Sequence, residues 1–276
     1  MDPYLDYPRI VHIETMAVCN AACSFCPYPT MDRIGSRMSD EFIEKILTDL
    51  EDMPPELPFE ISPFKINEPF LDVRLIDILK DINTRLPQAG LRMFSNGSPL
   101  TSKTLDRLSE IRNVRYLWIS LNHYEEKAYG ELMKLPFSRT LQRLDSIHER
   151  ELPFQVVTSR VSDLTEADDA FCTFVEDRWP KFTPVLISQH GWLGSNVHPS
   201  IPTVVPNERC NRWHEIEITA TGRVALCCVD AHAEFPLGDI HKQHILDVYN
   251  APFFKQMRAG KMTRLAYDPC NRCTYR

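Results

Sequence analysis

Short β-prone runs alternate with longer amphipathic segments between about residue 9 and residue 190. This rhythm is typical of a parallel sheet whose strands are connected by crossover helices. The β-prone runs are residues 9–15, 59–67, 91–95, 115–121, 154–160 and 182–189. The pattern therefore predicts an α/β core with six strands, which we place at residues 9–194.

Helix candidates fill the intervals between these strands. The first follows Ser39, a good N-cap, and has Asp40 and Glu41 in its first turn, where acidic side chains interact favourably with the helix dipole. Its apolar residues recur at the spacing of one helical face: Phe42, Ile43, Ile46, Leu47 and Leu50. The other helix candidates are residues 71–86, 102–111, 125–133 and 137–150.

The pattern changes after Gly194. Residues 195–208 are rich in Pro, Ser and Asn, as in a linker. Two alternating runs, 213–219 and 223–227, are then joined by Ala220-Thr221-Gly222, which is typical of a β-hairpin. A helix candidate at about 244–257 and a tail that ends in cysteines follow. We therefore expect a small second domain, a hairpin with a helix, over residues 195–276.

The composition excludes several classes of protein. The chain has 276 residues, of which 43% are hydrophobic and 25% charged, as is ordinary for a globular protein. No apolar run reaches the roughly 18 residues of a membrane span, and the N-terminus does not resemble a signal peptide. A net charge of −7 without a Lys/Arg run argues against a nucleic-acid partner. Nine cysteines without a secretory signal favour metal or redox roles, so we expect a cytoplasmic protein.

Three closely spaced cysteines, Cys19, Cys23 and Cys26, lie between the first predicted strand and the first predicted helix. A [4Fe–4S] cluster normally takes four thiolates, so three would leave one iron open to a further ligand. A zinc site also normally takes four ligands. No further Cys or His follows close by, although His12 is near in sequence. Chance clustering of free cysteines is the other alternative.

This spacing, with Phe25 before the last cysteine, resembles the CX3CX2C signature of the radical S-adenosylmethionine (SAM) superfamily. The resemblance implies that the core is a partial (β/α)6 TIM-like barrel. It also implies that the open iron chelates SAM. An electron from an external donor of the flavodoxin or ferredoxin type then splits SAM into methionine and a 5′-deoxyadenosyl radical.

Four more cysteines, Cys210, Cys227, Cys270 and Cys273, all lie in the second domain. Together with Gly222 they fit CX9–15GX4C followed by CX2C, which resembles the twitch domain, a truncated form of the SPASM extension of radical SAM enzymes. The resemblance implies an auxiliary [4Fe–4S] cluster with four thiolate ligands. A four-cysteine zinc ribbon is the alternative.

Two cysteines belong to neither set. Cys228 follows Cys227 directly, so along a strand its side chain would point to the opposite face. It could donate a hydrogen atom or be a second packed cysteine. Cys172 lies between Phe171 and Phe174 in a helical, apolar context, and we expect it in the core.

Ligands of barrel enzymes bind at the carboxyl ends of the strands. Glu68 and Pro69, after the second predicted strand, resemble the family's GGE(P) motif, although Ile66 and Asn67 replace both glycines. The resemblance implies that Glu68 engages the SAM amino group. An ordinary strand-to-helix turn is the alternative.

Other strand ends carry further candidates for SAM binding. Asn96 lies in a Ser-Asn-Gly turn after the third strand and resembles a family turn. Ser120 and Asn122 end the fourth strand, where the family often places a ribose contact. Arg160 ends the fifth strand, where a cation could pair with the SAM carboxylate. Beyond the sixth strand, His190 and Trp192 could touch adenine or substrate.

The first predicted strand begins at residue 9, so we expect no N-terminal leader-binding domain of the kind that many peptide maturases carry. A small polar substrate such as a sugar or aminocyclitol is then expected, oxidised by a dehydrogenase whose auxiliary cluster accepts an electron. The alternatives are an epimerase with Cys228 as hydrogen donor and a maturase that modifies a peptide or protein. A non-enzymatic iron–sulfur or zinc protein is the alternative from another class. Such a protein has no need of a three-cysteine site that leaves one iron open.

Overall fold

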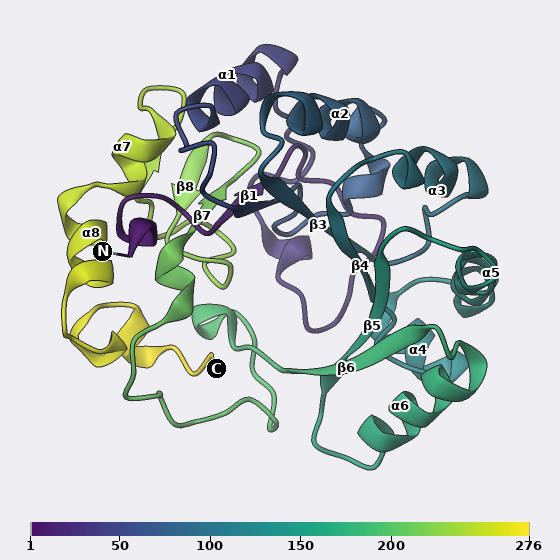
Figure 1. The fold of residues 1–276 in the computed structure, drawn as a ribbon. Coiled ribbons are helices and arrows are strands. Elements are labelled where there is room, and N and C mark those ends of the chain that lie inside the picture. Colours follow the sequence, from purple (N-terminus) through teal and green to yellow (C-terminus); the bar gives the residue numbers. More distant parts are fainter. Residues whose placement is uncertain (1, 276) are drawn as a thin grey trace.

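The computed structural model describes residues 2–275. Its strands form a single sheet in the order β6-β5-β4-β3-β2-β1-β7-β8-β9 (Figure 1). All pairs from β6 to β7 in this order are parallel, whereas the β7–β8 and β8–β9 pairs are antiparallel. The bounds are β1 (Ile10–Ile13), β2 (Phe59–Ser62), β3 (Ala89–Ser95), β4 (Val114–Ser120), β5 (Gln155–Ser162), β6 (Phe182–Ser188), β7 (Glu215–Ile218), β8 (Arg223–Ala225) and β9 (Gly238–Asp239).

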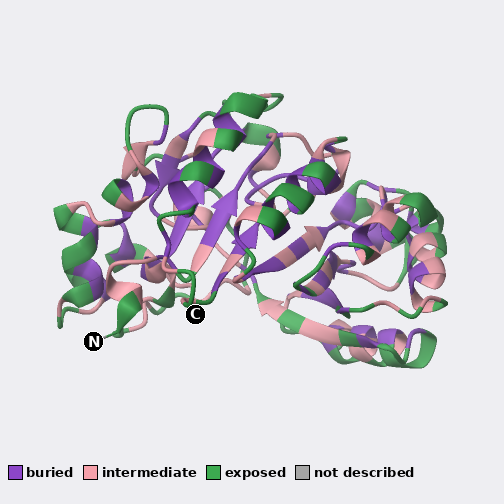
Figure 2. Cartoon of the chain, turned by 45° about the horizontal axis from the view of Figure 1, so that its top comes forward, coloured by how far each residue is buried: buried purple, intermediate pink, exposed green. Residues whose placement is uncertain are grey.

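Helices α1 to α6 form an arc outside the curved sheet, and α7 and α8 continue it on the C-terminal side (Figure 1). Figure 2 shows that the strands are mostly buried, whereas the helices expose their outer faces. The predicted α/β fold with a partial barrel is therefore confirmed. The bounds are α1 (Asp40–Leu50), α2 (Leu75–Arg85), α3 (Ser102–Ser109), α4 (Glu126–Met133), α5 (Phe137–His148), α6 (Ala167–Arg178), α7 (Ile245–Tyr249) and α8 (Pro252–Ala259).

Helix α1 shows how local sequence determines an element. The Oγ of Ser39 accepts a hydrogen bond from the amide of Phe42 at 3.1 Å, so the predicted N-cap is present. The apolar face predicted from the spacing is the buried face of the helix. None of the helices in residues 2–275 is long and apolar enough to cross a membrane.

Two predicted elements end early, each at a proline. The strand predicted to reach Asn67 stops at Ser62, because Pro63 has no amide hydrogen to donate to the ladder. The single helix predicted for residues 244–257 is two helices, α7 and α8. Pro252 starts α8, and a proline disfavours helical geometry at the residue before it.

The C-terminal hairpin extends the sheet of the core. Strand β7 pairs in parallel with β1, so β1 lies between β2 and β7. A buried ion pair reinforces this junction, because Arg33 contacts Glu14 at 2.6 and 3.0 Å. Arg33 also donates to the carbonyl of Ala231 at 2.5 Å, and Glu14 accepts from the amide of Ala220 at 3.0 Å. The C-terminal segment is thereby tied to the strand that precedes Cys19.

Candidate active site

A cavity of about 540 Å³ opens at the carboxyl ends of the parallel strands. The loop after β1, the turns after β2, β3 and β4, and the segment after β6 contribute to its wall, and the C-terminal hairpin closes one side. This is the end of a barrel at which ligands bind. The site predicted from the strand ends therefore coincides with a real cavity.

All three N-terminal cysteines, Cys19, Cys23 and Cys26, line this cavity. Their loop is held by Asn20, which donates to Ser98 Oγ at 2.8 Å. Burial raises the pKa of the Cys19 thiol to about 11 and that of Cys26 to about 12. A bound cation reverses this effect, since a thiol that coordinates a metal is deprotonated. These thiols therefore suit a positively charged centre.

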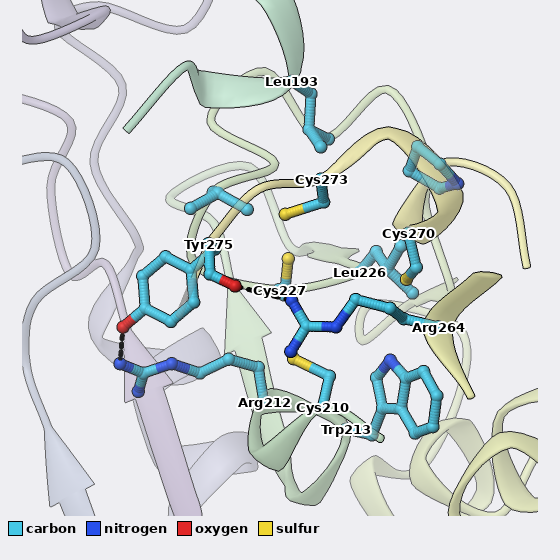
Figure 3. Close-up of a pocket in the computed structure, with 12 residues that line it drawn as sticks. Leu193, Cys210, Arg212, Trp213, Leu226, Cys227, Arg264, Cys270, Cys273 and Tyr275 are labelled. Atoms are coloured by element: carbon cyan, nitrogen blue, oxygen red, sulfur yellow. Dashed lines mark hydrogen bonds between the residues drawn. The ribbon is translucent and has the colours of Figure 1, made fainter. Parts of the chain in front are cut away.

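The second set of cysteines, Cys210, Cys227, Cys270 and Cys273, lines a smaller pocket next to the cavity (Figure 3). Cys210 precedes a 3-10 turn, Cys227 follows β8, and the other two lie at the C-terminal tail. The tail is held by Arg264, which donates to the carbonyl of Tyr275 at 2.6 Å. Residues far apart in sequence are thus brought together as a four-thiol set.

The spacing of the sulfur atoms distinguishes between a zinc ion and a cluster. Among residues 2–275, no three cysteine sulfurs all lie within 4.8 Å of one another. A zinc ion with Zn–S distances of about 2.3 Å would hold its tetrahedral ligands about 3.8 Å apart. Neither set therefore has the close spacing that a single zinc ion imposes on its ligands.

Glu68 lines the cavity and is almost fully buried. Its carboxylate accepts hydrogen bonds from the amide of Asn96 at 2.6 Å, from Ser95 Oγ at 3.0 Å and from the amide of Phe70 at 3.2 Å. Burial nevertheless raises the pKa of Glu68 to about 7. Glu68 thus joins the turn after β2 to the turn after β3, and it can still face a ligand.

The cavity wall also contains most of the other predicted contacts. These residues are Asn96, Ser120, Asn122, His190 and Trp192. Asn96 donates to Asn20 Oδ1 at 2.8 Å, and Trp192 donates to the carbonyl of Phe25 at 2.9 Å. Both hydrogen bonds connect the strand ends to the cysteine loop. Asn96 and Trp192 therefore position that loop and also line the cavity.

Arg160 does not line the cavity. Its guanidinium contacts Asp163 and Asp168 at 2.7 Å each and donates to the carbonyl of Asn122 at 2.8 Å. Side chains alternate along a strand, and on β5 it is the neighbouring Val161 that faces the cavity. Arg160 therefore supports Asn122 from behind, and we do not assign it to a SAM contact.

Sequence analysis assigned no role at this site to a group of charged residues. His12, Lys65, Arg212 and Glu217 line the cavity, and Glu215 contacts His12 and Arg212. The two glutamates alternate with isoleucines, which in a two-stranded hairpin would place them in solvent. Strand β7 instead lies inside the sheet, so all four of its residues are buried. The signal available in the sequence was an alternating run with acidic residues that follows Cys210, a predicted cluster ligand.

The cavity and the auxiliary pocket share a wall. Arg212, Val229 and Tyr275 line both of them, and Arg212 donates to the hydroxyl of Tyr275 (Figure 3). Cys228 lines the cavity, whereas the preceding Cys227 lines the pocket. Burial raises the pKa of the Cys228 thiol to about 12, so this cysteine is a neutral thiol.

Two family models match the chain. The radical SAM superfamily model matches residues 13–177, and SPASM, an iron–sulfur cluster-binding domain, matches residues 210–274. A comparison with curated proteins finds no match.

Several solved structures have a similar fold. BtrN in complex with AdoMet and 2-DOIA has a TM-score of 0.68 at 18% identity, covering 96% of this chain and 92% of that chain. SuiB from Streptococcus suis bound to precursor peptide SuiA has a TM-score of 0.70 at 14% identity, and the match covers 98% of this chain and 70% of SuiB. The structure of anSMEcpe with bound AdoMet has a TM-score of 0.68 at 11% identity, and the match covers 96% of this chain and 87% of anSMEcpe.

At these identities the solved structures share the fold of this chain. The radical SAM model covers more than half of the sequence, including all three cysteines of the N-terminal set. The protein therefore belongs to the radical SAM superfamily of enzymes, which use a [4Fe–4S] cluster and SAM, and it carries a SPASM domain for an auxiliary iron–sulfur cluster.

Proposed function

We propose that this radical SAM enzyme oxidises a small polar substrate by two electrons, as a dehydrogenase of the sugar or aminocyclitol type. In this proposal Cys19, Cys23 and Cys26 hold the SAM-binding cluster within a core of residues 9–194. Residues 195–276 form the auxiliary domain, and its four cysteines Cys210, Cys227, Cys270 and Cys273 hold the second cluster. Family members need an external reductant, which we take to be of the flavodoxin or ferredoxin type in the cytoplasm.

The shared wall between cavity and auxiliary pocket is the observation that carries this proposal. When bound, the clusters and SAM supply a 5′-deoxyadenosyl radical and a one-electron acceptor. Removing a hydrogen atom, a proton and an electron from an alcohol gives a carbonyl. Only side chains such as Arg212, Val229 and Tyr275 separate a substrate in the cavity from the four-cysteine set. This arrangement supports the proposal, because an auxiliary cluster held by the four cysteines would lie next to the place where the electron is released.

The cavity itself favours a polar substrate of modest size. Its volume of about 540 Å³ is in the range of small-molecule sites. Apolar side chains such as Phe94 and Trp118 form part of its wall, while Lys65, Arg92 and Arg212 supply donors. This combination of apolar surface and a few placed polar groups suits a ligand with several hydroxyl or amino groups.

Epimerisation is the second candidate, because Cys228 lines the cavity as a neutral thiol and could donate a hydrogen atom. The two reactions differ in their products. The reduced, reconstituted enzyme is incubated with SAM and a panel of sugars and aminocyclitols in D2O, and 5′-deoxyadenosine and the product mass are measured. We expect a product that has lost two hydrogens and that still forms with Cys228→Ser. A product of unchanged composition that carries one solvent deuterium, and that is abolished by Cys228→Ser, would identify an epimerase.

We expect Glu68→Gln to weaken SAM binding by about 1.5–3 kcal/mol, roughly 10- to 150-fold in Kd, because a charged acceptor is lost. The substitution keeps the size of the side chain, although its amide nitrogen cannot accept one of the hydrogen bonds that Glu68 receives from the turns after β2 and β3. Equilibrium dialysis of SAM against the anaerobically reconstituted protein measures the change. Asp72→Asn is the matched control, since Asp72 is a buried carboxylate of the same loop that does not line the cavity. An unchanged Kd for Glu68→Gln would exclude Glu68 from the SAM site.

A further inference from the structure

Three buried side chains on the adjoining strands β1 and β7, those of His12, Glu215 and Glu217, face one another, and two of them, His12 and Glu217, line the cavity. The register of the two strands sets His12 opposite Glu217, with Glu215 one repeat away on the same face. The Nε2 atom of His12 lies 3.4 Å from Oε2 of Glu215 and 3.5 Å from Oε1 of Glu217. One ligand atom from each residue can be chosen so that all lie within 4.8 Å of one another.

None of these facing atoms makes a hydrogen bond. The side chain of Glu217 is 0% exposed, and those of Glu215 and His12 are 6% and 8% exposed. Buried carboxylate oxygens without a donor are costly, and a neutral imidazole nitrogen that faces them adds a third acceptor. A proton on His12 or Glu217, or a metal ion, would satisfy these facing atoms.

The two distances measured from His12 are compatible with a metal ion. Ligand atoms at about 2.0–2.2 Å from a tetrahedral ion such as Zn²⁺ lie roughly 3.3–3.6 Å from one another. The measured separations of 3.4 and 3.5 Å from Nε2 of His12 fall in this range. Imidazole nitrogen and carboxylate oxygen are together the donor set that Zn²⁺, Mn²⁺ and Fe²⁺ accept.

The other polar atoms of His12 and Glu215 already have hydrogen-bond partners, as in the outer shell of a metal site. The Nδ1 atom of His12 lies 3.2 Å from the carbonyl of Phe64, which accepts its proton and leaves the lone pair on Nε2. Arg212 donates to Oε1 of Glu215 at 2.7 Å, so Oε2 is the oxygen that remains for an ion. Such outer contacts orient metal ligands and fix the tautomer of a ligating histidine.

Glu217 has a similar arrangement. The Nζ atom of Lys65 lies 3.8 Å from its Oε2 and donates to the carbonyl of Cys227 at 3.2 Å. Oε1 of Glu217 therefore remains on the side of His12. His12 and Glu217 both line the cavity, so a fourth position at the site would be open to it.

We propose that His12, Glu215 and Glu217 hold a divalent first-row metal ion whose open position faces the substrate cavity. Three protein ligands and one open position are typical of catalytic rather than structural metal sites. Lys65 and Arg212 already balance the two carboxylates, so the ion adds positive charge and favours an anionic fourth ligand, such as the oxygen of a deprotonated hydroxyl. That last role rests on the proposed oxidation of an alcohol, whereas binding of the metal does not.

The test uses the full chain with both iron–sulfur clusters assembled, so that the cluster cysteines are occupied. Mn²⁺ is titrated in, and the loss of the free-ion signal in electron paramagnetic resonance reports binding; Zn²⁺ competes for the same site. We expect one Mn²⁺ per chain and a loss of affinity of at least about 100-fold in Glu217→Gln, since changes to outer contacts alone cost about 10- to 100-fold. Glu60→Gln on the neighbouring β2, a half-buried carboxylate outside the cavity wall, should bind Mn²⁺ as the unmodified protein does.

The iron and sulfide contents, together with a thermal unfolding curve from circular dichroism, show whether each variant is folded. If Glu217→Gln does not fold, His12→Gln tests the same site. The proposal is overturned if the unmodified protein binds neither Mn²⁺ nor Zn²⁺, which would leave the site to a proton. It is also overturned if Glu217→Gln or His12→Gln binds the metal as tightly as the unmodified protein. Metal binding without oxidation of any alcohol would instead contradict the proposed function and leave the metal site standing.

Discussion

Replacing Cys19, Cys23 and Cys26 together by Ala should halve the iron and sulfide content and abolish SAM cleavage. Two [4Fe–4S] clusters correspond to about eight iron and eight sulfide per chain, so about four of each should remain. Without these thiolates the SAM-binding cluster has no ligands in the cavity. Anaerobic iron and sulfide analysis, together with an assay for 5′-deoxyadenosine, measures both effects.

Cys172→Ala is the control for this experiment. Cys172 lies on α6, packs against the core and lines neither the cavity nor the auxiliary pocket. Its loss should leave both the iron content and SAM cleavage unchanged. An unmodified protein with stoichiometric zinc at the cysteines and without labile sulfide would contradict the cluster assignment.

Replacing Cys270 and Cys273 together by Ala should separate SAM cleavage from product formation. A cluster with four thiolate ligands has no open iron for SAM, so 5′-deoxyadenosine should still form. In the proposed oxidation the substrate electron would then have no acceptor beyond the shared wall, and product should be lost. Quantifying 5′-deoxyadenosine and product in the same reaction gives the ratio that tests this uncoupling.

The same variant also removes contacts of the C-terminal tail, so its folding must be measured alongside its activity. Both cysteines belong to a tail that Arg264 holds through the carbonyl of Tyr275. An unchanged melting curve together with about four iron per chain would show that the core and its cluster are intact. If this variant converts substrate normally, the dehydrogenase proposal fails and epimerisation through Cys228 becomes the better account.

Local pattern was sufficient for most of the secondary structure. The cap and apolar face of α1 and the six core strands depend on neighbours within a few residues, which the sequence displays directly. The breaks at Pro63 and Pro252 depend on the same short range, yet the hydrophobic periodicity continued through them. Periodicity alone does not register the loss of an amide hydrogen, so the strand was predicted too long and the helix was predicted without its break.

The cysteine sets were also visible in the sequence, because cluster ligands come in short, recognisable spacings. The role of Arg160 was not visible in the sequence. Its partners Asp163 and Asp168 are close to it along the chain, but the sheet decides which face of β5 carries its side chain. The end of a strand indicates that a side chain is near the cavity. It does not indicate whether that side chain points inward.

By itself the sequence determined the superfamily, the α/β core and the two groups of cysteines, because these follow from local spacing and periodicity. Only the tertiary structure decided which distant residues meet. His12 faces Glu215 and Glu217 because β7 pairs with β1 rather than ending the sheet as an exposed hairpin. Pairing of strands more than 200 residues apart is decided by the order of the whole sheet, and no local pattern carries that order.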